Sequence, residues 1–384
     1  MNQNQRISKI IQEFDAQGWH RAGTDVDHLS ARWLADKGRE FGLDLELERF
    51  EFSRVVPQDC FMEVDGRRIE GLPFFDGGFT SPEGVSGRIG PIGSESEIGL
   101  GEVTRASGPL GGEPNREFQR HRMPGDSGAN QALVAVTIGE KPGLMAANAP
   151  AFRQPFGPPV LQVSSEEQES LALHAKRNSP VRLVASAERI ESESFNVTGL
   201  MKGSEQDLPP LLVMTPRSGW WHCASERGAG LACWLEVMRQ VVQAKPQRDV
   251  IFVATSGHEL GLPGIDDFLE RRPGLANRGH AWLHFGADVG RETRFSATDD
   301  GLKAQTKAAL KKASVSPARP APTGTTVGAE SQVVARAGGT VAALVGHSPQ
   351  FHLESDRWPG EIDVESIGRV ANAFASLALE LSKE

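Results

Sequence analysis

Three short, fully apolar runs in the C-terminal half constrain the fold more than any other feature of the sequence. They are LLVMT (211–215), VIFVAT (250–255) and WLHFGA (282–287). Apolar runs of this length are typical of strands that are buried on both faces of a sheet. Apolar residues at helical spacing occur between the first two runs (228–244) and near the C-terminus (363–382). Strands alternating with helices predict an α/β domain with a doubly wound mixed sheet flanked by helices.

A segment of different composition interrupts this alternation of strands and helices. From about residue 75 to 194, Gly and Pro are frequent, and short β-type pieces such as ALVAVTIG and VRLVASAE are separated by turns. This composition predicts an inserted domain that is mostly β, with one or two helices. The α/β domain is therefore expected to consist of residues 1–74 and 195–384.

Composition excludes several classes of protein. The chain has 384 residues, 39% hydrophobic and 24% charged, which is enough to bury a core. Its net charge of -9 disfavours a nucleic-acid partner, and no apolar run approaches the ~20 residues of a membrane span. The N-terminal residues lack the apolar core of a secretory signal, and the three cysteines form no C-x-x-C pair. We expect a cytoplasmic globular protein.

Polar residues follow each apolar run directly. TSGHE (255–259) places His258 and Glu259 at the carboxyl end of a predicted strand. The H-E-x-x-H zinc motif is excluded because its second histidine would be Leu262. TPRSGWWHCASER and HFGAD follow the other two runs. Because ligands bind outside the carboxyl ends of strands in such sheets, we expect one polar site at this edge.

Taken together, these segments resemble the M28 zinc aminopeptidases, in the form that carries an inserted protease-associated (PA) domain. VIFVATSGHELGLPG is similar to the family's strand ending in Glu-Glu-x-Gly-x-x-Gly, and FHLESD (351–356) is similar to the segment around its last histidine ligand. The resemblance covers most of the chain. It implies an M28-type fold with a PA-like insert at 75–194 and an amide-hydrolysing site with two zinc ions.

The family's ligand pattern is altered in this sequence. The position of the family's His-x-Asp reads Thr-Pro-Arg (215–217), so the first ligand is absent. By the resemblance, Glu226 corresponds to the family's Asp that bridges the two zinc ions. Glu259 corresponds to the second Glu of the family's Glu-Glu pair, which is a zinc ligand. His258 corresponds to the first Glu of that pair, which is the general base. The family has a further Asp ligand one strand later, and this Asp corresponds to His284 or Asp288. The family's last histidine ligand corresponds to His352.

These positions imply one divalent ion at most, zinc or another metal. Glu226, either His284 or Asp288, and His352 would be an adequate set, since a catalytic zinc needs three protein ligands and an open position. The family's other zinc site would retain only two ligands in this sequence, Glu226 and Glu259. Either His258 or Glu259 could act as the general base.

Arginines and tryptophans suggest a substrate pocket. Arg217 and Arg227 could anchor a substrate carboxylate, although a guanidinium at position 217 also lowers the local affinity for a cation. Trp220 and Trp221 could form flat apolar walls, or could simply pack in the core. A small amide with a carboxylate would suit Arg217.

Three functional hypotheses remain open on the sequence alone. The leading one is an M28-like metallohydrolase of aminopeptidase type that cleaves an amide or peptide bond. The second is a catalytically inactive homologue with a binding role. The third is a metal-free lyase or amidase that uses His258 and Glu259. The expected partner is a small-molecule or short-peptide substrate, and homo-oligomerisation is left open.

Overall fold

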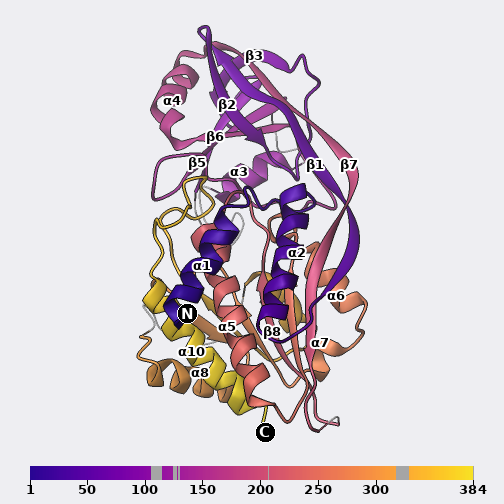
Figure 1. The fold of residues 1–384 in the computed structure, drawn as a ribbon. Coiled ribbons are helices and arrows are strands. Elements are labelled where there is room, and N and C mark those ends of the chain that lie inside the picture. The colour runs from indigo at the N-terminus through magenta and orange to yellow at the C-terminus, as the bar shows by residue number, and fades with distance from the viewer. Residues whose placement is uncertain (105–114, 124–127, 129, 206, 317–327, 384) are drawn as a thin grey trace.

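The chain forms two lobes joined by a long two-stranded ribbon, as the computed structural model shows (Figure 1). It describes residues 1–104, 115–123, 128, 130–205, 207–316 and 328–383. Strands β1 (Glu46–Val64) and β7 (Pro180–Met201) pair antiparallel along most of their length and run through both lobes. The ribbon therefore ties the predicted insert to the α/β domain.

The lower lobe contains the predicted α/β sheet. Among the described residues its strand order is β7-β9-β8-β10-β12-β11, with β8, β9, β10 and β12 parallel and the two outer strands antiparallel. The sheet is therefore mixed, as predicted. Its remaining strands are β8 (Leu211–Pro216), β9 (Val250–Thr255), β10 (Ala281–Phe285), β11 (Arg294–Ala297) and β12 (Val341–Val345).

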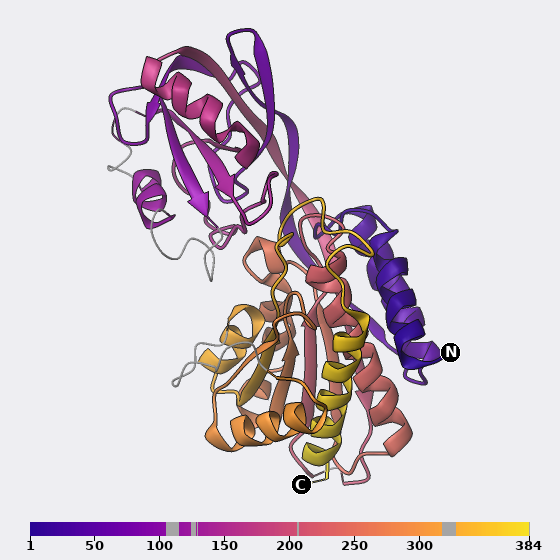
Figure 2. The ribbon, with the colours of Figure 1, turned by 90° about the vertical axis from the view of Figure 1, so that its left-hand side faces the viewer.

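Alternation along the strands explains why both faces of this sheet are covered. Successive side chains of a strand point to opposite faces. Leu211 and Val213 join one buried cluster, whereas Leu212 and Met214 join another on the opposite face. The first cluster lies under α1 (Gln3–Asp15), α2 (Asp25–Glu40), α5 (Ala229–Ala244), α8 (Asp300–Lys312) and α10 (Val364–Leu381); the second lies under α6 (Pro263–Glu270), α7 (Leu275–Arg278) and α9 (Ala329–Arg336) (Figure 2). The apolar runs are thus strands buried on both faces.

The upper lobe is a smaller sheet, and its described residues also form the helices α3 and α4. Its strands run in the order β2-β6-β5-β4-β3, and β3 to β6 are parallel along this order. The elements are β2 (Arg67–Pro73), β3 (Val85–Pro91), β4 (Ile98–Thr104), α3 (Asn115–Arg122), β5 (Ala132–Ile138), β6 (Val160–Ser164) and α4 (Gln168–Arg177). The end of β1 and all of β2 belong to this lobe, so it begins before residue 75.

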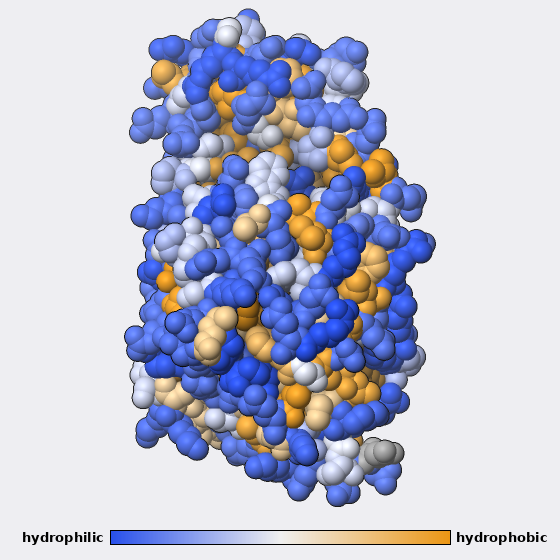
Figure 3. All heavy atoms as spheres, viewed as in Figure 1, coloured by the Kyte–Doolittle hydropathy of each residue, from blue (hydrophilic) through white to orange (hydrophobic). Residues whose placement is uncertain are grey.

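The surface is mostly polar on the face of Figure 3, where apolar side chains appear as small groups among charged ones. Scattered apolar residues of this kind are normal on a water-facing surface. No helix among the described residues is long and apolar enough to cross a membrane.

Candidate functional site

The site lies where β8, β9 and β10 end, and Ala146 and Asn148 of the upper lobe contact the loops there. β8 ends at Pro216 and is followed by a loop and a π-helical turn (Ala224–Gly228) that leads into α5. β9 ends at Thr255 and is followed by a short 3-10 turn (His258–Leu260). The predicted convergence of these segments at one sheet edge is what the structure shows.

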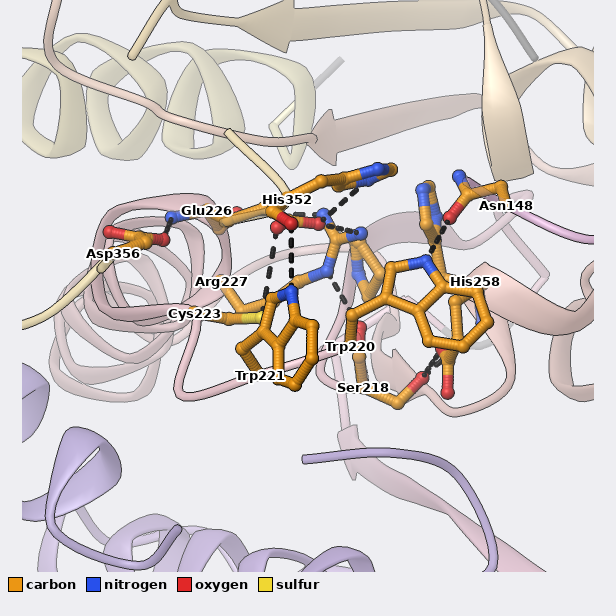
Figure 4. Close-up of polar contacts among 12 residues, drawn as sticks. Asn148, Ser218, Trp220, Trp221, Cys223, Glu226, Arg227, His258, His352 and Asp356 are labelled. Carbon is orange, nitrogen blue, oxygen red and sulfur yellow. Dashed lines mark hydrogen bonds and ion pairs between the residues drawn. The ribbon is translucent and has the colours of Figure 1, made fainter. Parts of the chain in front are cut away.

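Glu226 and His352 meet in the first of two polar clusters (Figure 4). His352 Nε2 lies 3.3 Å from Glu226 Oε1, and both residues are buried. Arg227 Nη2 lies 2.8 Å from the same Glu226 oxygen. Burial raises the pKa of Glu226, but the charges of Arg227 and His352 outweigh it, and the net pKa lies well below the ordinary value. Glu226 is therefore an ionised buried carboxylate.

Asp356 fixes the turn that carries Glu226. Its two carboxylate oxygens accept hydrogen bonds from the backbone N–H groups of Ser225 and Glu226, at 2.8 and 2.9 Å. Burial is the main reason that the pKa of Asp356 is raised, and the nearby charge of Asp288 adds to it. Asp288 is itself buried, and its backbone N–H donates to the Glu226 carbonyl. Of the two residues considered for the same ligand position, His284 and Asp288, it is Asp288 that lies beside this cluster.

The upper lobe contacts His352 directly. His352 Nδ1 lies 2.7 Å from the carbonyl oxygen of Ala146, and the Ala146 N–H donates to the His352 carbonyl. With a proton on Nδ1, His352 donates a hydrogen bond to the Ala146 carbonyl oxygen, and its Nε2 faces Glu226. A backbone partner of this kind fixes both ring orientation and tautomer.

His258 and His284 belong to a second cluster, which is built around Glu330. His258 Nδ1 lies 2.9 and 3.1 Å from the two Glu330 oxygens, and His284 Nε2 lies 3.6 Å from one of them. Burial raises the pKa of Glu330, but the charge and hydrogen bond of His258 outweigh it and lower the pKa to about 2. Burial lowers the pKa of His284 to about 4. At neutral pH, Glu330 is therefore ionised and His284 neutral.

Sequence reasoning missed Glu330, although the residue is central to this cluster. It lies in the first turn of α9, where an acidic residue is also explained by the helix dipole. No motif surrounds it, and its partner His258 is 72 positions away. The only signal was an acid at a helix start, which occurs in many helices without function.

Glu259 makes its hydrogen bonds to residues outside both clusters. Its carboxylate accepts hydrogen bonds from the backbone N–H of Ala22 and from the Ser218 hydroxyl, each at 2.7 Å. Burial raises the pKa of Glu259 and these two bonds oppose the rise. Glu259 and His352 were both expected at the strand-end site, but the Glu259 oxygens bond to Ala22 and Ser218 rather than to His352. Glu259 therefore links the N-terminal segment, through Ala22, to the turn that follows β9.

Arg217 is an internal residue, which corrects its expected role as a substrate anchor. Its side chain is fully buried, with Nη1 2.7 Å from Asp27 Oδ1 and Nη2 2.6 Å from the Phe195 carbonyl oxygen. A guanidinium with these partners cannot reach a substrate carboxylate. Arg217 therefore gives no support to an acidic substrate.

The two tryptophans are packing residues of the site wall. Trp220 is fully buried, packs edge-on against Phe75 and donates its Nε1–H to Asn148. Trp221 is also buried and donates to the His352 carbonyl at 2.8 Å. Of the two alternatives raised by the sequence, the structure favours packing over an exposed apolar wall.

The metal that the resemblance implies does not fit this donor arrangement. Among the described residues, no group of three or more His, Cys, Asp or Glu side chains is placed to hold a metal ion. At Glu226, moreover, a guanidinium already contacts the oxygen that faces His352. A divalent ion about 4 Å from that guanidinium would be repelled by roughly 8 kcal/mol at an effective dielectric constant of ~20. We therefore derive no catalytic step through a metal.

Comparisons with known proteins agree with the fold and with the sequence resemblance. Residues 215–378 match the model of Peptidase family M28. Aminopeptidase YwaD of Bacillus subtilis is 22% identical over an alignment of 272 residues. The match covers 68% of this chain and 56% of that relative, little more than half of the relative's length.

Solved structures match over nearly the whole chain. A zinc aminopeptidase from Bacillus subtilis has a TM-score of 0.78 at 18% identity, with 99% of this chain and 95% of that chain covered. An M28 peptidase precursor from Shewanella amazonensis has a TM-score of 0.76 at 16% identity, with 100% and 95% covered. Residues 215–378 are therefore similar to Peptidase family M28, and the chain has the fold of the zinc aminopeptidase structures that it matches.

Proposed function

We propose that the chain is an M28-type hydrolase that cleaves a peptide or amide bond. The observation that carries the proposal is the contact between His258 and Glu330 at the carboxyl end of β9. This is the edge at which ligands bind in such sheets. The proposal is supported by relatives described as aminopeptidases.

His258 is the proposed general base. With its Nδ1–H donated to Glu330, its Nε2 can take a proton from water, and the ion pair stabilises the imidazolium that forms. The activated water attacks the carbonyl carbon, and the same proton can then pass to the departing amine. His258 is the more open member of this pair, since its side chain is 12% exposed and that of Glu330 2%.

The upper lobe is proposed as a PA-type insert that covers the site. Ala146 contacts His352, Asn148 accepts from Trp220, and the Ala149 N–H donates to the Glu259 carbonyl. These contacts support a substrate of limited size, such as an aminoacyl amide or a short peptide. A cytoplasmic location also belongs to the proposal, supported by three buried cysteines that are all free.

A panel of aminoacyl amides, short peptides and N-acyl amino acids tests the proposed reaction. Each substrate is incubated with the protein alone and with zinc, manganese or cobalt, and amine release is measured. We expect turnover of at least one aminoacyl amide or peptide. Absence of turnover across the panel under all metal conditions would contradict the hydrolase and favour a binding role.

A further inference from the structure

The first polar cluster contains a cation that belongs to the protein itself. The Arg227 guanidinium is 1% exposed and lies 2.8 Å from Glu226 Oε1. Its Nε donates to the Ser218 carbonyl at 2.7 Å, so the side chain is held from both ends (Figure 4). Arg227 is the residue directly after Glu226 in the π-helical turn, and the turn is fixed by Asp356. The guanidinium is therefore built into the site.

The surrounding charges keep this guanidinium protonated. Burial lowers the pKa of Arg227, but attraction to carboxylates, Glu226 first and then Glu330 and Glu259, outweighs it, and the net pKa is raised. The carboxylates come from different parts of the chain, so Arg227 lies in the shared field of both polar clusters. A fixed cation in that position compensates buried negative charge, which otherwise is costly.

We propose that Arg227 is the resident cation of this site and excludes a metal ion from Glu226 and His352. The two side chains meet as two ligands of one ion would, since two ligands about 2.0–2.2 Å from a tetrahedral zinc are themselves roughly 3.3–3.6 Å apart; here the distance is 3.3 Å. The oxygen on which they converge is the one that Arg227 contacts. The inference concerns the site of the proposed hydrolase but does not depend on its activity.

Zinc titration calorimetry on the whole protein tests this role. Wild type and His352→Ala should bind zinc equally weakly, because no zinc reaches His352 while Arg227 is present. Arg227→Met removes the charge and retains much of the volume, and it should bind zinc about 100-fold more tightly than wild type. The double variant Arg227→Met/His352→Ala should lose that gain.

Arg122→Met is the matched control. Arg122 is also buried and pairs with an acid, Asp76, at 2.8 Å, but it belongs to α3 of the upper lobe and its ion pair involves neither Glu226 nor His352. Its loss should bring no zinc binding. A folded Arg227→Met variant without increased affinity would overturn the proposal.

The wild-type comparison decides the question even if Arg227→Met does not fold. Tight zinc binding by wild type that His352→Ala abolishes would also overturn the proposal. Equal weak binding by these two proteins supports it. Because heat of binding is measured rather than turnover, the result is independent of whether the proposed hydrolysis is found.

Discussion

Replacing Asp27 by Asn should lower the free energy of unfolding by about 3–5 kcal/mol, the usual cost of breaking a buried ion pair by removing one partner. Asp27 and Arg217 both have fully buried side chains and lie 2.7 Å apart. Asp27 also accepts from the hydroxyls of Ser256 and Ser194, at 2.9 and 2.5 Å. The substitution leaves the guanidinium without its charge partner in the core. Urea unfolding at pH 7 measures the change.

An exposed pair supplies the control for this experiment. Glu365 and Arg369 pair at the surface of α10, four residues apart. Glu365→Gln should cost no more than about 0.5 kcal/mol. If Asp27→Asn cost as little as this control, the buried Asp27–Arg217 pair would not stabilise the fold. Arg217→Met should likewise lower stability rather than raise the KM for acidic substrates.

Replacing His258 by Ala should lower kcat by about 10²–10⁴-fold, the usual contribution of a general base. The expectation follows from the position of the ring at the end of β9 and from its contact with Glu330, which orients it and compensates its charge. Steady-state rates on the best substrate of the panel measure the loss. Glu330→Gln should cause a smaller loss, because a neutral amide still positions the ring.

His174→Ala is the control for the histidine variants. His174 lies on α4 in the upper lobe and contacts Ser179, away from the strand ends. Its replacement should leave kcat unchanged. A rate for His258→Ala within about threefold of wild type, far from the expected loss for a general base, would remove His258 from the reaction.

Much of the fold could be predicted from local patterns. The apolar runs at β8, β9 and β10 and the helical spacing of α5 and α10 indicated the sheet and its flanking helices. At the start of α2, the Thr24 side chain accepts a hydrogen bond from the Asp27 N–H, a cap that the residue type itself favours. The approach of Glu226 to His352 was implied by the family resemblance.

Contacts between residues far apart in the sequence could not be predicted in this way. Asp27 and Arg217 are 190 positions apart, and neither carries a signal that points to the other. One partner of Glu259 is the backbone N–H of Ala22, which no residue type reveals. Glu330 has no motif around it. In each case tertiary packing selects the partner, so the sequence shows an ionisable residue but not its role.

The most direct test of the account is a crystal structure with an aminoacyl phosphonamidate, which mimics the tetrahedral intermediate of amide hydrolysis. The account predicts that its phosphoryl oxygens lie within hydrogen-bonding distance of His258 Nε2, beneath residues 146–149 of the upper lobe. Binding of the analogue elsewhere on the protein, with the strand-end site unchanged, would contradict it.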